Sequence, residues 1–501
     1  MFEDVFQSLT PVSLLVGAGA LLGLHLVYSS FSSKQNGREP PGPTPLPLFG
    51  NLFQLDFKRL HISLLNLSKK YGSVFTVYFG TKKVVVLAGY KTVKEALVDH
   101  DAEFGERSVS HIFDDINKGY GIVFSNGEMW KEMKHLAMST LRDFESKNFT
   151  EERIIEECQH LIQSFQQYKG QAFDNRRLMT SAALNIMSAL TLGRRFEYTD
   201  PVLQTYVDRD YQSITYLKSS SIQLYNMIPW LGPFIKNRSN LLNTAEKNRE
   251  DSNRIIADLK ETLNPEKTRC IVDAFLIHRS KLEESDSVQS LYSDESLVYF
   301  VRNLFQAGTI TPETKLKWAL LLMAKFPHIQ DQVQAELGRV VGQRQVRVWD
   351  RKYLPYTDAV LHEIHRFANI IPMAISHRTS QDVTFQGYFI KKGTSVFPLL
   401  TSVLYDESEW ENPFTFNPSR FLDKDGKFIR KDAFLAFSAG RRVCLGESLA
   451  KMEIFLFFTS LLQQFRLTPP PGVSEDELDL TPVIGPTLYP PPHELCAVSR
   501  Y

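Results

Sequence analysis

Residues 437–446 read FSAGRRVCLG and carry the strongest structural signal in the chain. Gly440 and Gly446 bracket Cys444, and a helical pattern begins within a few residues of the second glycine. A cysteine in such a loop can accept backbone N–H bonds, and the positive end of the helix dipole stabilises its thiolate. This sulfur is therefore suited to bind a metal, and Arg442 can pair with an anionic group beside it. For an isolated cysteine, a buried structural role beside a surface arginine would be the preferred alternative.

The same residues satisfy the complete pattern FxxGxRxCxG, which resembles the haem-binding loop of the cytochrome P450 superfamily. A match at all the fixed positions of this pattern is highly specific. The resemblance implies that Cys444 is the proximal ligand of a heme b iron (iron protoporphyrin IX). It also implies that Phe437 packs under the haem and that Arg442 meets a haem propionate. Thiolate ligation pushes electron density onto the iron and favours cleavage of the O–O bond.

Two upstream elements test this resemblance. Glu363 and Arg366 are neighbours on one face of a helix, because they are three residues apart. An ExxR pair alone is common and is usually a surface ion pair of little energetic value. Residues 418–421, PSRF, resemble the PxRF element of the superfamily. The resemblance implies that Glu363, Arg366 and Arg420 form a buried triad that supports the cysteine loop.

Three further residues are implied as haem-binding. Trp130 and Lys134 stand at the ends of a WxxxR-like motif, in which lysine replaces the arginine. A lysine can neutralise a carboxylate but cannot form the bidentate fork of arginine. His377 follows Ile371-Pro372 at the place of another propionate donor, where Ser376 replaces the proline that often precedes it. By the resemblance, Trp130, Lys134 and His377 contact the propionates.

Residues 305–312, FQAGTITP, resemble the oxygen-activating helix of the superfamily. Ala307, Gly308 and Thr311 match its pattern, which implies that the first two lie at the haem and that the Thr311 hydroxyl acts in catalysis. The usual acid is replaced by Ile310, and an isoleucine cannot relay the protons that dioxygen activation requires. We therefore expect NADPH to be oxidised with little product formed, and much of the dioxygen consumed to be released as hydrogen peroxide.

Pro312 is a second departure from the pattern. It lacks the N–H that would bond the carbonyl of Gly308, so we expect a kink there. Thr311 precedes this proline and is expected to leave helical φ and ψ. Glu313 lies one helical turn beyond the missing acid and is a candidate substitute for it. A solvated or ion-paired Glu313 beside Lys317 is the favoured alternative.

The N-terminus predicts a membrane anchor. The segment Val12–Tyr28 is largely apolar and approaches the roughly 20 residues that span a bilayer. Glu3 and Asp4 precede it, and Lys34 and Arg38 follow it, which predicts that the C-terminal side lies in the cytosol. A cleaved signal peptide is the alternative, but it would require a positively charged N-terminal region.

A proline-rich run, PPGPTPLP at 40–47, follows the anchor and predicts a stiff extended spacer. We expect an anchor at 1–33, a hinge at 34–50 and a haem-binding catalytic domain at 51–501. This organisation predicts a protein of the endoplasmic reticulum membrane whose catalytic domain faces the cytosol.

Composition excludes several other classes. The 501 residues are 43% hydrophobic and 12% aromatic, which is enough apolar material for a sizeable core. The formal net charge is zero, which gives no electrostatic case for a nucleic-acid partner. The four cysteines form no CxxC pair, so a disulfide scaffold and a zinc ribbon are unsupported.

Periodicity predicts one large, mainly α domain with a small β portion, in agreement with the cytochrome P450 fold. Short strands are expected at Val74–Phe79 and Lys83–Leu87, with a turn at Gly80, and again within Asp382–Val396. Ser293 is a plausible N-cap of a helix that contains the FQAGTITP segment.

A closer likeness refines the expected activity. The hinge, FGER at 104–107 and LCAV at 495–498 resemble vertebrate microsomal family 2, and residues 469–486 resemble the fish 2K subfamily. The resemblance implies a monooxygenase that acts on lipophilic substrates such as fatty acids or xenobiotics. Electrons would come from NADPH through NADPH–cytochrome P450 reductase, with cytochrome b5 as a further candidate partner. Candidates for a basic docking face, each otherwise an ordinary surface charge, are Lys131, Lys134, Arg441 and Lys451.

Two alternatives remain open at this point. A haem-thiolate isomerase or dehydratase of lipid peroxides needs no proton relay, which would suit Ile310. A lipid-binding haem protein that turns over poorly is the other alternative. Apolar residues near the motifs are candidates for the substrate pocket, although any of them can simply be core: Ile112, Phe113, Phe305, Ala307, Ile371, Ile375, Ile484 and Leu488.

Overall fold

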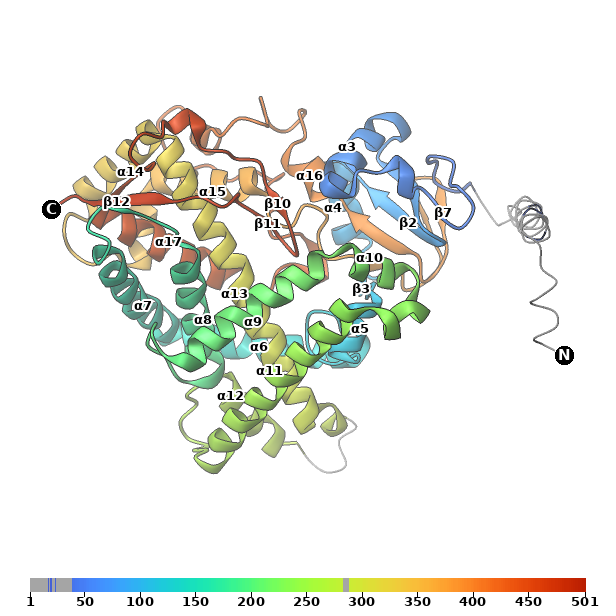
Figure 1. The fold of residues 1–501 in the computed structure, drawn as a ribbon, viewed down its shortest axis with the longest axis horizontal. Coiled ribbons are helices and arrows are strands. Elements are labelled where there is room, and N and C mark those ends of the chain that lie inside the picture. The colour runs from blue at the N-terminus through green and yellow to red at the C-terminus, as the bar shows by residue number, and fades with distance from the viewer. Residues whose placement is uncertain (1–16, 18, 20–22, 24–37, 283–287) are drawn as a thin grey trace.

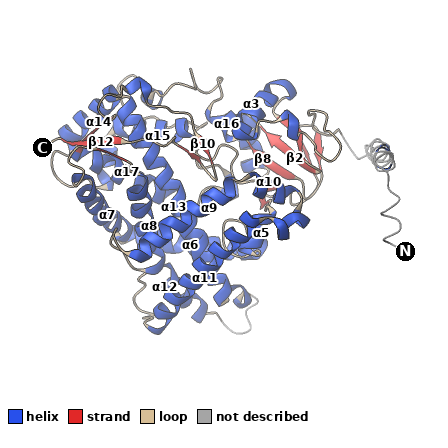
Figure 2. Ribbon diagram, in the orientation of Figure 1, coloured by secondary structure: helices blue, strands red, loops and turns tan. Residues whose placement is uncertain are grey.

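The structure, a computed structural model, describes residues 17, 19, 23, 38–282 and 288–501. The predicted anchor, Val12–Tyr28, lies outside the described residues apart from three glycines. Within the described part of the chain, no helix is both long enough and apolar enough to cross a membrane. The body is mainly helical, with small sheets towards its edges (Figure 2), which confirms the predicted mainly α class with a small β portion.

Helices make up most of the described chain. The α-helices of the described chain from residue 38 onwards are α3 (Leu60–Tyr71), α4 (Tyr90–Lys94), α5 (His111–Asn117), α6 (Gly127–Ser146), α7 (Phe149–Gln166), α8 (Arg176–Leu192), α9 (Pro201–Lys218), α10 (Ser220–Met227), α11 (Lys236–Glu261), α12 (Ile271–Ser280), α13 (Asp294–Lys325), α14 (Pro327–Val340), α15 (Pro355–Ala368), α16 (Leu400–Leu404) and α17 (Glu447–Gln464). Three short helical turns also matter for the site: η3 (Glu95–Asp99), η7 (Pro418–Phe421) and η8 (Gly440–Arg442).

The strands are short. They are β1 (Val74–Phe79), β2 (Lys82–Leu87), β3 (Glu106–Arg107), β4 (Ala172–Phe173), β5 (His377–Arg378), β6 (Val383–Phe385), β7 (Tyr388–Ile390), β8 (Ser395–Pro398), β9 (Phe465–Thr468), β10 (Val483–Ile484), β11 (Leu488–Tyr489) and β12 (Leu495–Ser499). The largest sheet has the order β1-β2-β8-β5-β3 and lies at the end of the body away from the C-terminus (Figure 1).

Local sequence explains the sheet well. β1 and β2 pair antiparallel around Gly80, whose φ is +62°, as predicted, although β2 begins one residue earlier than expected. The strand-like region Asp382–Val396 becomes the hairpin of β6 and β7 followed by the start of β8. β8 then pairs in parallel with β2, although the two strands are about 300 residues apart. The predicted strands are therefore confirmed, and their long-range order comes from the fold.

Helix α13 crosses the middle of the body and packs against α8, α11, α15 and α17 (Figure 1). It begins as predicted, because the Ser293 hydroxyl accepts the Ser296 N–H at 3.1 Å. The helix continues through Pro312, and Thr311 is helical. The prediction that Thr311 leaves helical geometry is wrong, because a proline removes one hydrogen bond while the core packing of α13 holds the helix on both sides.

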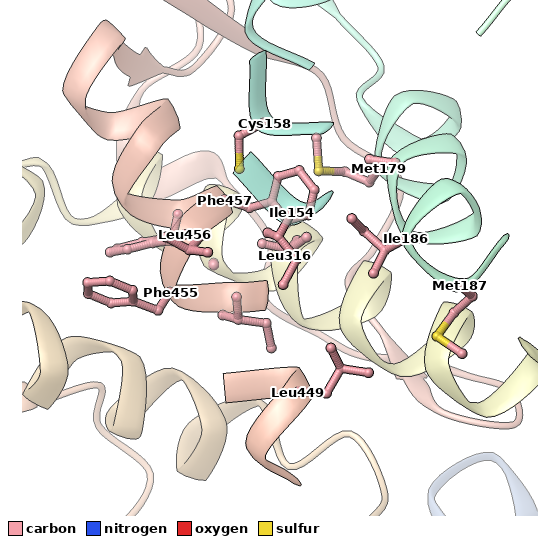
Figure 3. Packing of buried hydrophobic residues seen from close by; sticks show 14 of the residues in the cluster. Ile154, Cys158, Met179, Ile186, Met187, Leu316, Leu449, Phe455, Leu456 and Phe457 are labelled. Atoms are coloured by element: carbon pink, nitrogen blue, oxygen red, sulfur yellow. The ribbon is translucent and has the colours of Figure 1, made fainter. Parts of the chain in front are cut away.

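The main hydrophobic core lies between α7, α8, α13 and α17. Residues 453–463 of α17 are all buried, as expected of a helix that lies wholly inside a large domain. Figure 3 shows Phe457 of α17 near Leu316 of α13, with Met179 and Ile186 of α8 beside them. This core fixes the position of α17 and therefore of the cysteine loop that precedes it.

Candidate functional site

The cysteine loop closes on itself through its backbone. The Cys444 N–H donates to the Phe437 carbonyl at 3.0 Å, and the Glu447 N–H donates to the Cys444 carbonyl at 3.4 Å. Gly440 has a φ of +73°, and a Cβ atom there would lie 1.6 Å from the carbonyl oxygen of Leu97 in η3. Only glycine fits both this left-handed conformation and this close approach. The loop is thus pressed against η3, and α17 begins at Glu447, three residues after Cys444.

The Cys444 side chain is accessible, whereas Cys158, Cys270 and Cys496 are buried. Protein atoms nevertheless surround most of the sulfur. This burial raises the pKa of the Cys444 thiol to about 11. The Gly446 N–H acts against burial, because it hydrogen-bonds the sulfur and favours the thiolate. A thiol of this kind becomes a thiolate when it binds a metal cation, which deprotonates it. The geometry therefore suits a metal ligand better than a free nucleophile.

Trp130 of α6 lies among three cations. The Arg442 guanidinium is 3.9 Å from the ring centroid of Trp130, the Lys134 Nζ atom is 5.0 Å from it, and the Arg441 guanidinium is 5.3 Å from it. Cation–π attraction stabilises this arrangement. Lys134 also donates to the carbonyl of Arg441 at 2.8 Å. The structure thus brings together Trp130, Lys134 and Arg442, the residues that the resemblance implied as propionate contacts.

Arg107 of β3 joins this group, although the sequence did not indicate it as a site residue. Its Nη1 donates to the Ile375 carbonyl at 2.9 Å and lies 2.8 Å from Nε2 of His377. Nδ1 of His377 lies 2.6 Å from the Phe104 carbonyl, which can only accept, so Nδ1 carries the proton and Nε2 accepts from Arg107. Burial, reinforced by the charge of Arg107, lowers the pKa of His377 to about 3, so the ring is neutral. His377 therefore orients Arg107.

The signal for Arg107 was present in the FGER segment at 104–107, which by itself indicated only a likeness to family 2. Its position depends on the pairing of β3 with β5, which sets Arg107 opposite His377. The two residues are 270 positions apart. No local pattern could have joined them.

The cations at this site lack carboxylate partners. Among the described residues, Arg107, Lys134, Arg441 and Arg442 form no ion pair, and the Nε atom of Arg107 is buried without a partner. Burial, together with repulsion from Arg107 and Arg441, lowers the pKa of Arg442 to about 9. Burial lowers the pKa of Arg107 to about 10. A ligand with two carboxylates would relieve this repulsion, so the residues fit the propionates of a haem.

The predicted triad is formed and buried. Glu363 and Arg366 are both fully buried, and their side chains form two parallel hydrogen bonds of 2.7 and 2.8 Å. Arg420 of η7 approaches the same carboxylate at 3.4 Å. Arg366 also donates to the carbonyls of Leu404 and Pro413, each at 2.8 Å. The triad thus joins α15 to the segment that leads into the cysteine loop.

Helix α15 also contacts the loop directly. The ring of His365 is 5.0 Å from the ring of Phe437, and the two rings are tilted by 58°. Burial keeps the pKa of His365 well below its usual value, so the contact is between two neutral rings. Phe437 is half-buried at the edge of the loop, with the Lys451 ammonium 5.3 Å from its centroid.

The predicted residues of α13 occupy different faces of that helix. The Thr311 hydroxyl donates to the carbonyl of Ala307 at 2.9 Å, and the Ala307 side chain is accessible. A Cβ atom on Gly308 would lie 2.3 Å from the sulfur of Met187, which lies beside α13 in Figure 3. Gly308 therefore permits the close packing of α8 on α13. Ile310 is buried.

Glu313 is fully buried, so the prediction of a solvated side chain is wrong. The alternative of an ion pair is confirmed, because Lys317 Nζ lies 3.2 Å from Glu313 Oε2. The Thr180 hydroxyl of α8 donates to the same oxygen. Helix α8 covers this face of α13 and shields the pair from solvent.

A cavity of about 100 Å³ lies between α5, α8, α9, α11 and α13. Of the predicted pocket residues, Phe113 and Phe305 line it. Ile112 instead packs into the small core of α5, α10 and α11. Ala307, Ile371, Ile375, Ile484 and Leu488 do not line this cavity either, and the carbonyl of Leu488 accepts from the Trp318 indole at 2.9 Å.

Comparison with known proteins agrees with this geometry. The family model described as Cytochrome P450 matches residues 40–497. The chain is 58% identical to Cytochrome P450 2K1 of Oncorhynchus mykiss over 501 residues, which cover 100% of this chain and 99% of that protein. It is 55% identical to Cytochrome P450 2K6 of Danio rerio over 456 residues, 91% of this chain and 90% of that one. It is 40% identical to Cytochrome P450 2B4 of Oryctolagus cuniculus over 495 residues, 97% and 99% of the two chains.

Proposed function

The chain belongs to the cytochrome P450 family and is a haem-thiolate monooxygenase, and we propose that it oxidises lipophilic substrates such as fatty acids and xenobiotics with electrons from NADPH. One observation supports this most strongly. An accessible thiol, Cys444, lies in a rigid loop beside buried cations that have no carboxylate partner. A metal-binding sulfur and a dianion-binding cluster together fit one cofactor, heme b.

The residues have distinct roles in this proposal. Cys444 would bind the iron, and Phe437 would contact the haem. Arg107, Arg442, Lys134 and Trp130 hold the propionates, with His377 fixing Arg107. When bound, the haem supplies dioxygen activation, which thiolate ligation favours.

Helix α13 supplies the other side of the site. Ala307 and Gly308 would contact the haem, and Thr311 holds a proton at its Oγ1 atom. That proton now lies in a 2.9 Å hydrogen bond to the Ala307 carbonyl, from which the hydroxyl can rotate towards a substrate or water.

Partners and location follow from the same proposal. NADPH–cytochrome P450 reductase delivers the electrons, and cytochrome b5 is a second candidate donor. Of the predicted docking residues, Lys131 is exposed in a pair with Glu128, and Lys451 pairs with Glu447. Residues 1–33 anchor the chain in the endoplasmic reticulum membrane, 34–50 form the hinge, and the catalytic domain, 51–501, faces the cytosol.

Carbon monoxide spectroscopy tests the ligand. The reduced protein with carbon monoxide should show the red-shifted Soret band of thiolate-bound haem. Cys444→Ala should abolish this band, whereas Cys496→Ala should keep it. A band that survives in Cys444→Ala would refute the assignment of the ligand.

A reconstituted assay tests the activity. Full-length protein with purified reductase is given NADPH and a panel of fatty acids and drugs. Product that depends on NADPH supports the proposal. Conversion of a lipid peroxide without NADPH, and no NADPH-dependent product, would favour the isomerase alternative instead.

Protease digestion of sealed microsomes tests the orientation. Protection of the catalytic domain from protease inside sealed microsomes would refute the proposed orientation.

A further inference from the structure

One face of α13 carries an unusual series of polar residues. Arg302, Gln306 and Thr309 line the cavity between α9, α11 and α13, and Glu313 and Lys317 continue the same face one and two turns further on. The cavity wall from α9 contributes the carboxyl of Asp210. The cavity, of about 100 Å³, has mainly apolar walls, but its polar groups lie on α9, α11 and α13, where they can hold a few ordered waters.

Two carboxyl groups meet at this face with unused oxygens. Glu313 is fully buried, and its Oε1 atom has no hydrogen-bond partner. The Oδ2 atom of Asp210 is likewise buried and without a partner. An unpaired buried carboxyl oxygen is costly unless it carries a proton or binds water. The pair therefore needs a proton, a water or both.

The surrounding charges decide where the proton lies. Lys317 and the Thr180 hydroxyl both contact Oε2 of Glu313. Burial, and then the charge of Glu313, raise the pKa of Asp210 to about 7, while Lys317 acts in the opposite direction. The proton therefore resides on Asp210 below neutral pH, and the carboxyl can release and regain it near neutral pH.

Other charged or titratable groups face the same space. They are Arg302 of α13, Tyr206 and Tyr211 of α9 and Tyr489 of β11, whereas α11 contributes the neutral Asn248 and Ser252. The Arg302 guanidinium donates to the Ala245 carbonyl and has no carboxylate partner among the described residues. Among the charged groups, Glu313 and Lys317 have the resolved effects on the pKa of Asp210.

The segment of α13 between the cavity and Thr311 offers a passage for a proton. Pro312 has no N–H, so the carbonyl of Gly308 lacks its helical partner and can accept from a water. The Thr309 side chain lies at the cavity, and Thr311 lies beyond it on α13. Between these two threonines, Ile310 occupies the position where the pattern of the superfamily has an acid, and an isoleucine cannot carry a proton.

We propose that Asp210, coupled to Glu313, is the acid that supplies protons for dioxygen activation in this chain, in place of the acid missing at position 310. Asp210 Oδ2 holds the proton, and cavity waters carry it past Thr309 and the Gly308 carbonyl towards Thr311. Solvent then returns a proton to Asp210 through the same waters. This inference rests on the proposed NADPH-driven function, and it replaces the expectation of heavy peroxide release.

The test compares Asp210→Asn with Asp208→Asn in the full-length, haem-loaded protein. Asp208 is a matched control, because it lies on the same helix but is exposed and pairs with Arg177. The first readout does not depend on turnover: infrared spectra across pH 5–9 should show one protonated carboxyl that titrates near neutral pH. This band should be absent in Asp210→Asn and present in Asp208→Asn.

The second readout separates proton delivery from substrate binding. With NADPH and reductase, Asp210→Asn should form about tenfold less product per NADPH, with a matching rise in hydrogen peroxide. With an organic hydroperoxide as oxidant, which needs no proton delivery to dioxygen, its product yield should equal that of the native protein.

Three results would overturn the proposal, and a fourth would instead concern the proposed function. Unchanged product per NADPH in Asp210→Asn overturns it, as does an equal loss in the NADPH and hydroperoxide reactions, which would indicate a binding role. Absence of the titrating band from the native protein also overturns it. A native protein that shows the band and the hydroperoxide reaction but no NADPH turnover would instead refute the proposed electron source.

Discussion

Replacing Gly440 by alanine should disrupt the cysteine loop, whereas the same change at Gly446 should not. Gly440 has a φ of +73°, and an added Cβ would lie 1.6 Å from the Leu97 carbonyl oxygen. Gly446 has a φ of −90°, and no protein atom lies within 4 Å of its added Cβ. The two glycines flank the same cysteine, so each controls for the other.

The magnitude follows from two separate costs at Gly440. A left-handed conformation costs an alanine about 1–2 kcal/mol relative to glycine. The overlap with Leu97 forces a backbone shift, and such overpacking costs about 1–3 kcal/mol. We therefore expect Gly440→Ala to lower the free energy of unfolding by roughly 2–5 kcal/mol. For Gly446→Ala, the loss of an N-cap glycine should cost less than about 1 kcal/mol.

Urea unfolding and the reduced carbon monoxide spectrum measure this difference. Gly440→Ala should unfold at a clearly lower urea concentration and lose most of the thiolate Soret band. Gly446→Ala should resemble the native protein in both measurements. If Gly440→Ala kept the native stability and spectrum, or if Gly446→Ala were the more damaging change, the loop would not be held by its contact with η3.

Three further predictions concern buried charges. Glu363→Gln should lower the free energy of unfolding in urea by about 3–5 kcal/mol, because it leaves the fully buried Arg366 without its carboxylate, whereas Glu128→Gln in an exposed pair should lower it little. Equal effects of the two changes would refute the role of the triad. Ile310→Glu should lower the free energy of unfolding, because position 310 is buried, and should raise product per NADPH by less than about twofold, because Asp210 already supplies the proton. A tenfold gain in product per NADPH would argue against Asp210 and Glu313 as the proton source. Asp210→Asn should match the stability of the native protein near pH 4 and exceed it by roughly 2–4 kcal/mol at pH 8, because a carboxyl whose folded-state pKa is raised to about 7 destabilises the native protein as pH rises from about 4 to 7. A stability difference that does not depend on pH would contradict the assigned pKa.

Local patterns were enough to predict much of this protein. The cysteine loop is a contiguous motif, so its glycines, Arg442 and Cys444 could be interpreted without knowing the fold. The β1–β2 hairpin and the start of α13 are equally local, since a turn at Gly80 and a cap at Ser293 act within a few residues. The partners within the triad were predicted only because their motifs resemble a known superfamily.

The remaining features depend on contacts between distant segments. Arg107 meets His377 because β3 pairs with β5, and Asp210 comes close enough to Glu313 to be affected by its charge because α9 packs against α8 and α11, which both pack against α13. Pro312 is a helix breaker by local propensity, yet α13 stays helical. Propensities and caps act over one or two turns, whereas burial between packed helices sets which charges lose their water and which helix survives a missing hydrogen bond. Those free energies belong to the assembled core and are absent from any short segment of the chain.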